Sequence, residues 1–245
     1  MKKQKVCAYV VADSNNMKFY ENLKKTWEKT NPDIELRLFG EKEIKEQNDP
    51  HFFYRATPVL GRELLKEYDT VIKIDADSLV FSDLSHTWDG DFDLAVVQNS
   101  NPREAQKLEV KLWNLHPLQY VNAGYVVMKS KKFVEHWYKQ CFSPNFTAYR
   151  YREQDLLNIL IFYGNYKVKF LDIADKFHGL ASKGYEPEMV LEKGKIILKS
   201  TDEWATDGDK EICITHFAGG NDPNKGKYKT MYSSKVAKHI DKLLA

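Results

Sequence analysis

The chain has 245 residues, 42% hydrophobic and 29% charged, which fits one α/β domain with a sizeable core. Its formal net charge of +2 argues neither for nor against a polyanionic partner. The three cysteines lie far apart without CxxC spacing, which argues against a disulfide framework or a zinc knuckle. No apolar run approaches the roughly 18 residues of a membrane span, so we expect a cytoplasmic protein without a transmembrane segment.

Strand and helix patterns alternate along the first half of the chain. The apolar run at 6–12 predicts a strand, apolar positions at helical spacing over 19–27 predict a helix, and 34–39 predict a second strand. The expected elements that follow are a surface loop or short helix at 41–50, a helix at 55–67 with Pro58 in its first turn, strands at 71–74, 93–98 and 120–128, helices at 101–113, 133–141 and 156–161, strands at 168–171, 196–198 and 211–215, and a final helix at 236–244. This pattern predicts a mixed α/β sheet whose ligand site lies at the carboxyl ends of its strands.

Asp75-Ala76-Asp77 directly follows the apolar strand expected at 71–74. Two carboxylates this close at the mouth of a buried strand would repel each other and raise at least one pKa, a conflict that a divalent cation relieves. Carboxylate oxygens suit Mg²⁺ and Mn²⁺, and an added imidazole favours Mn²⁺. One alternative is an exposed turn in which the Asp residues cap the next segment. A metal-dependent phosphatase of the haloacid-dehalogenase type is another, although its Asp-x-Asp normally lies on the first strand and continues with a small residue and Thr or Val.

Four segments in order resemble the signature of the glycogenin-like and LgtC-like glycosyltransferases of family 8. They are VIKIDADSLV at 71–80, VNAGYVV at 121–127, EQDLLN at 153–158 and THFAGG at 215–220. The resemblance covers about residues 5–225 and implies the GT-A fold, a Rossmann-like mixed sheet flanked by helices. It also implies a single domain over 1–245, with a nucleotide-sugar and metal-binding half at about 1–128 and an acceptor-binding half at about 129–245.

The resemblance assigns site residues position by position. Asp75, Asp77 and His216 match the metal ligands, although a histidine at the end of a strand can also be structural. Glu153 and Gln154 match a catalytic Asp-Gln pair, here with a longer acid. It also implies donor-binding positions. Asp75 lies near the ribose, together with Ala76 of the Asp-x-Asp segment. The others are Asn122, Ala123 and Gly124 at the donor sugar, and Gly219 at the phosphates.

Two positions depart from the family pattern. Asp222 stands where the family often has a lysine that neutralises the diphosphate, so Lys225 or Lys227 is the nearest candidate. Val59 stands where the helix before the Asp-x-Asp segment usually supplies a basic side chain, and Arg55 or Arg62 on the same helical face could replace it, with Arg55 preferred. Ala12 and Asp13, at the end of the first strand, occupy the place where the family cradles the base.

The resemblance implies a metal-dependent hexosyltransferase that uses a nucleotide sugar, expected to be a UDP-sugar, and retains the configuration of the transferred hexose. Mn²⁺ or Mg²⁺ is the expected cofactor. The acceptor is left open among a glycan, a lipid-linked glycan, a protein and a modified nucleic acid. A non-catalytic sugar- or nucleic-acid-binding protein on the same fold is the alternative function.

Overall fold

A mainly parallel six-stranded sheet forms the centre of the computed structural model, which describes residues 4–98, 119–178, 188–200, 208–217, 229 and 232–245. Its strand order is β2-β1-β3-β6-β5-β7, and only β6 runs antiparallel to its two neighbours. The bounds are β1 Val6–Val11, β2 Glu35–Phe39, β3 Thr70–Ile74, β5 Leu94–Gln98, β6 Val121–Met128 and β7 Val168–Leu171.

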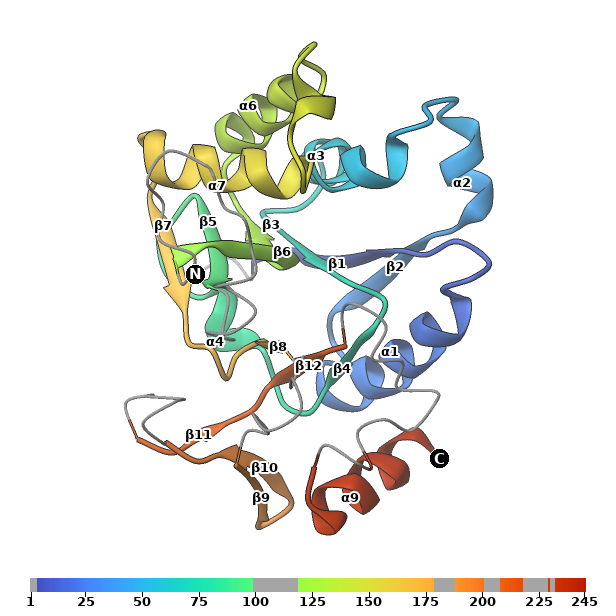
Figure 1. Cartoon of the computed structure of the whole chain (residues 1–245), viewed down its shortest axis with the longest axis vertical. Helices are drawn as coiled ribbons and strands as arrows, with labels where there is room; N and C mark the ends of the chain where they lie inside the picture. Colours follow the sequence, from blue (N-terminus) through green and yellow to red (C-terminus); the bar gives the residue numbers. More distant parts are fainter. Residues whose placement is uncertain (1–3, 99–118, 179–187, 201–207, 218–228, 230–231) are drawn as a thin grey trace.

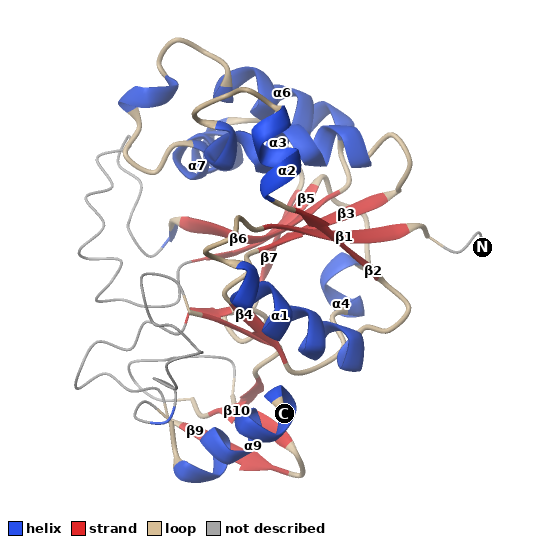
Figure 2. Cartoon of the chain, turned by 90° about the vertical axis from the view of Figure 1, so that its right-hand side faces the viewer, coloured by secondary structure: helices blue, strands red, loops and turns tan. Residues whose placement is uncertain are grey.

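Helices cover both faces of this sheet, and each face has its own apolar cluster (Figure 2). α3 (Phe52–Leu64), α6 (Lys131–Cys141) and α7 (Glu153–Tyr163) pack on one face. α1 (Met17–Thr30) and the short α4 (Ser85–Trp88) lie on the other, where α1 buries Leu23 and Trp27. The remaining helix of this half, α2 (Glu41–Glu46), follows β2 and buries none of its residues.

Two small sheets and α9 (Ser234–Leu244) lie beyond the helix α1 side of the main sheet (Figure 1). In the first of these sheets, β12 (Ile214–His216) pairs antiparallel with β4 (Ser78–Val80) and parallel with β8 (Phe177–His178). The second consists of β9 (Met189–Glu192), β10 (Lys195–Leu198) and β11 (Lys210–Glu211). A third apolar cluster joins these strands to α9.

The predicted mixed α/β architecture is confirmed, but several local predictions were wrong. The helix predicted at 55–67 begins at Phe52, so Pro58 lies in its interior rather than its first turn. The strand predicted at 211–215 is two strands, because the pairing partner changes within it. The first, β11, pairs with β10, and the second, β12, pairs with β4. The short elements β4, α4, β8 and β9 were not predicted, and the helix predicted at 101–113 lies outside the described residues.

No helix in the described ranges combines the length and the apolar character that crossing a bilayer requires.

Candidate active site

Asp75, Asp77 and His216 converge at the carboxyl end of β3. His216 Nε2 lies 3.3 Å from Asp75 Oδ2 and 3.1 Å from Asp77 Oδ1. Ligand atoms at neighbouring corners of an octahedron around Mg²⁺ or a similar cation are about 3 Å apart, because each metal–oxygen bond is about 2.1 Å long. The two carboxylates and the imidazole therefore fit a divalent cation both in chemistry and in spacing.

Strand pairing explains how residues so far apart in the sequence meet. β12 pairs with β4 so that His216 stands opposite Ser78, the residue directly after Asp77. The Phe217 N–H then donates to the Asp77 carbonyl at 2.9 Å, which fixes the chain on both sides of the ligands. The histidine is brought to the carboxylates by backbone hydrogen bonds that leave its side chain available to the site.

Gly124 is the point of closest approach between β6 and these ligands. A Cβ at this position would lie 2.6 Å from His216 Cε1 and 2.8 Å from Asp75 Oδ2, too close for any side chain. The Gly124 carbonyl also accepts a hydrogen bond from the Asp75 N–H at 2.9 Å. Glycine is needed here because β6 passes directly against the cation ligands.

Two buried lysines face the same carboxylates, and neither was predicted from the sequence. Lys73 on β3 donates to Asp75 Oδ1 and, at 2.7 Å, to the Ala123 carbonyl. Lys176, just before β8, donates to Asn122 Oδ1 and is only 2% exposed. Burial lowers the pKa of Lys176 to about 7, although Asp75 and Asp77 oppose the shift. For Lys73 the sequence did contain a signal, because it is a lysine inside an otherwise apolar strand.

Burial works against charge at Asp75 and His216 as well, but neighbouring groups of opposite charge outweigh it. Burial would raise the pKa of Asp75, yet Lys73 and His216 hold it well below its usual range. Burial and Lys176 would lower the pKa of His216, yet Asp77 and Asp75 raise it above the ordinary value. The site thus concentrates charge of both signs in a largely buried place, as candidate functional sites do.

Two adjoining cavities meet at Asp75. The first, of about 350 Å³, contains the cation ligands and is lined also by Val11, Asn16, Phe53, Ala76 and Asn122. The second, of about 180 Å³, shares Val11, Phe53 and Asp75 with the first and is lined also by Tyr54, Ala56, Thr57, Lys73, Ala123, Gly124, Glu153 and Gln154. Phe53 and Tyr54 are about half exposed, so they offer aromatic faces at the rim.

The α7 segment EQDLLN holds the start of β6 through its polar side chains. Asn158 bonds both backbone groups of Val121, accepting from its N–H at 2.7 Å and donating to its carbonyl at 2.9 Å. Gln154 Oε1 accepts from the Ala123 N–H at 2.9 Å, and Asp155 Oδ1 accepts from the Tyr120 hydroxyl at 2.5 Å. These bonds fix the stretch that leads into Asn122-Ala123-Gly124.

Glu153 begins α7 at the wall of the second cavity. Burial raises the pKa of its carboxyl to about 8, although Lys73 opposes the shift. Its Oε2 atom is buried and has no hydrogen-bond partner among the described residues. The preceding residue, Arg152, has the unusual backbone angles φ 50° and ψ −121° for a residue other than glycine. Such strain often accompanies functional sites.

Arg55, which was predicted to contact the donor, is engaged with other residues. Arg55 forms an ion pair with Asp49 at 2.9 Å, donates to the Cys141 carbonyl at 2.9 Å, and lies 4.6 Å from the ring centres of Phe142 and Phe146. Neither cavity is lined by this arginine.

Ala12 and Asp13 likewise do not line the cavities. Ala12 is fully buried, and Asp13 Oδ1 accepts from the N–H groups of Asn15 and Asn16 in the turn before α1. Val11, Asn16 and Phe53 occupy that end of the cavity instead. Gly219 and Lys225 lie outside the described residues.

Comparison with known proteins supports the fold. No protein-family model and no curated protein sequence matches the chain. Among solved structures, the bifunctional glycosyltransferase WbbM superposes with a TM-score of 0.65 at 16% identity over 99% of this chain, which spans about half (50%) of that protein's length. The galactosyltransferase LgtC, solved with donor and acceptor sugar analogues, superposes with a TM-score of 0.61 at 20% identity and covers 97% of this chain and 95% of its own.

A third solved structure widens the comparison. A glycosyltransferase involved in glycosylation of the major capsid of PBCV-1 superposes with a TM-score of 0.53 at 11% identity, covering 96% of this chain and 98% of its own. These superpositions establish the architecture. At such low sequence identity they do not establish the activity, which must be argued from the site. The chain has the GT-A fold of these glycosyltransferases, as the sequence predicted.

Proposed function

We propose that this chain is a metal-dependent glycosyltransferase that moves a hexose from a UDP-sugar to an acceptor, with retention of configuration. The observation that carries the proposal is the convergence of Asp75, Asp77 and His216 at the junction of two cavities at a strand carboxyl end. The solved structures of similar fold support it, because all of those compared above are glycosyltransferases.

The first cavity is the proposed place of the nucleoside diphosphate. Asp75, Asp77 and His216 would hold Mn²⁺ or Mg²⁺, which acts as a Lewis acid on the leaving diphosphate. Lys176 donates to Asn122 at the wall of this cavity, and in its protonated form it adds positive charge near the place where negative charge develops. Phe53, half exposed at the rim, offers a face on which the base can stack.

The second cavity is the proposed place of the transferred hexose. Gln154 lines it with its side-chain oxygen already oriented by the Ala123 N–H, so this oxygen can face the positive charge that develops at the anomeric carbon. Glu153 is largely protonated at neutral pH because its pKa is raised to about 8, so it can donate a hydrogen bond to a sugar hydroxyl. This favours a binding role for Glu153 over attack by its carboxylate.

Thermal melting with UDP and Mn²⁺ tests the proposal. We expect stabilisation that requires both ligands together, by about 2.7 kcal/mol when the free ligand is at 100 times its dissociation constant. Asp77→Asn should abolish this stabilisation and lower transfer from UDP-hexoses at least about 100-fold. Asp91→Asn, at an exposed aspartate paired with Lys167, is the matched control and should behave like wild type.

Two outcomes would contradict the proposal. Full, metal-independent transfer by Asp77→Asn would exclude the cation mechanism. No response of the wild type to any nucleoside diphosphate, with or without metal, would instead support a non-catalytic binding protein.

A further inference from the structure

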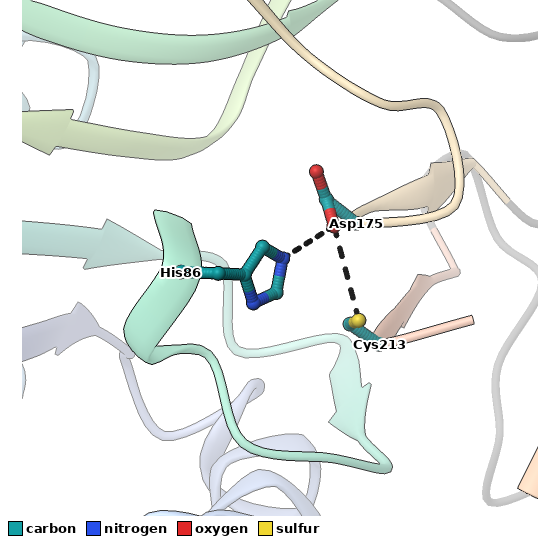
Figure 3. Close-up of side chains that lie close together, drawn as sticks. All are labelled: His86, Asp175 and Cys213. Atoms are coloured by element: carbon teal, nitrogen blue, oxygen red, sulfur yellow. Dashed lines mark hydrogen bonds and ion pairs between the residues drawn. The ribbon is translucent and has the colours of Figure 1, made fainter. Parts of the chain in front are cut away.

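A second cluster of metal-ligating side chains lies apart from the donor cavities. His86 comes from α4, Asp175 from the turn after β7, and Cys213 from the residue before β12, and one ligand atom of each lies within 4.8 Å of the others. His86 Nε2 is 2.7 Å from Asp175 Oδ1, and Cys213 Sγ is 3.9 Å from the same oxygen. Figure 3 shows the Asp175 carboxylate between the imidazole and the sulfur.

Backbone hydrogen bonds hold two of these three residues in place. The Asp172 N–H donates to Asp175 Oδ2 at 2.9 Å, which orients the carboxylate and leaves Oδ1 toward the cluster. The Cys213 N–H donates to the Ala174 carbonyl at 2.9 Å, and the Cys213 carbonyl accepts from the Phe81 N–H at 2.8 Å. Hydrogen bonds that orient the ligands in this way are typical of metal sites.

We propose that His86, Asp175 and Cys213 form a binding site for Zn²⁺. Zinc binds imidazole nitrogen, carboxylate oxygen and thiolate sulfur at about 2.0–2.3 Å, which places ligand atoms about 3.5 Å apart in a tetrahedron. The sulfur already has a suitable separation from the carboxylate oxygen. The imidazole must move outward by about 1 Å, and it can do so because the His86 side chain is half exposed.

Solvent reaches the cluster from the side of His86. His86 borders a surface hollow of about 410 Å³ that is lined also by Gln4, Ser85, Trp88 and Asp89. The Asp175 side chain is 13% exposed and Cys213 is 6% exposed, so the other two ligands lie beneath the imidazole. The arrangement gives three protein ligands with water as the fourth, entered from the His86 side.

Zinc binding at this site displaces protons. The Asp175 oxygen 2.7 Å from His86 Nε2 favours a proton on the imidazole in the metal-free chain. Zinc would replace this proton and the thiol proton of Cys213, and both protons pass to solvent. Binding therefore weakens as pH falls.

The sulfur distinguishes this site from the Asp75 site, whose ligands contain only oxygen and nitrogen. Co²⁺ is the probe: its addition to chelator-treated, reduced protein should produce a near-ultraviolet thiolate-to-cobalt charge-transfer band. The band should persist in Asp77→Asn and disappear in Cys213→Ser. Added Zn²⁺ should displace the cobalt and raise the thermal midpoint of the wild type.

Cysteine and histidine variants separate metal binding from misfolding. Burial raises the pKa of the Cys7 thiol to about 12 and that of Cys141 still further, so neither readily forms a thiolate. Cys141→Ser should therefore keep the band. His86→Ala changes a half-exposed residue outside the apolar clusters and should weaken cobalt binding at least about tenfold while retaining a cooperative melt. Absence of the band in the wild type, or its persistence in Cys213→Ser, would overturn the proposal.

Discussion

Glu153 is a carboxyl group whose surroundings oppose its charge, and this makes stability depend on pH. Its pKa rises from an ordinary 4.5 to about 8 in the folded chain. Between these values the unfolded chain loses the proton and the folded chain keeps it, so the stability present below pH 4.5 is progressively lost as pH rises to about 8.

Glu153→Gln should remove this pH dependence. We expect equal thermal midpoints for wild type and variant near pH 4, and a growing advantage for the variant that levels off above pH 8, worth on the order of a few kcal/mol. Melts followed by circular dichroism across this range measure the difference. Glu21→Gln, at an exposed position of α1, is the control, and a difference that does not change with pH would refute the assignment.

Single site residues could be predicted where short motifs mark them. The sequence pointed to Asp75, Asp77 and His216, and the structure brings their side chains together. It did not point to Lys176, whose role depends on its buried contact with Asn122. It did not point to Cys213 either, because this cysteine has no other potential metal ligand at CxxC spacing in the sequence. Arg55 was predicted from its helical face, but its contacts with the rings of Phe142 and Phe146 could not be foreseen.

At the scale of elements, α7 is the support for the start of β6. Asn158 satisfies both backbone groups of Val121 and donates as well to the Gln154 carbonyl at 2.8 Å. The asparagine is 1% exposed, so water cannot easily replace these bonds.

Asn158→Ala should lower the free energy of unfolding by about 2–4 kcal/mol, because two buried backbone groups lose their partners. Urea unfolding measures this loss, and Lys238→Ala on the exposed face of α9 is the control. A loss no larger than that of the control would show that α7 does not support β6 in this way.

Long periodic elements were predictable and short ones were not. The strands β1, β5 and β6 of the main sheet consist mostly of apolar residues, and the helices α3 and α6 bury one apolar face. β4 and β12 have three residues each and exist because they pair with each other, a tertiary contact that local sequence does not encode.

At the scale of the whole molecule, the chain supplies its own cations to the carboxylates of the candidate active site. Lys73 donates a hydrogen bond to Asp75, and Lys176 interacts electrostatically with both Asp75 and Asp77. We therefore expect metal removal by a chelator to abolish donor binding but not folding.

Lys73→Met tests this balance. In chelator the variant should be less stable than wild type by about 1–2 kcal/mol, a modest value because the Asp75 side chain is 35% exposed. Saturating Mn²⁺ should shrink the difference, since the cation replaces the missing charge. Melting both proteins with and without Mn²⁺ measures the coupling. Lys66→Met, at an exposed ion pair with Glu63, should show no such dependence on metal.

The pairing of β12 with β4 has a consequence for the order of events during synthesis. The ribosome makes β4 well before β12, because Ile214 follows Val80 by 134 residues, and among the described strands β4 has no other partner. A nascent chain can thus assemble most of the main sheet while an edge of β4 still lacks its neighbour. Cation binding should consequently appear late in translation, and chains that stall before Ile214 should be recognisable by their lack of it.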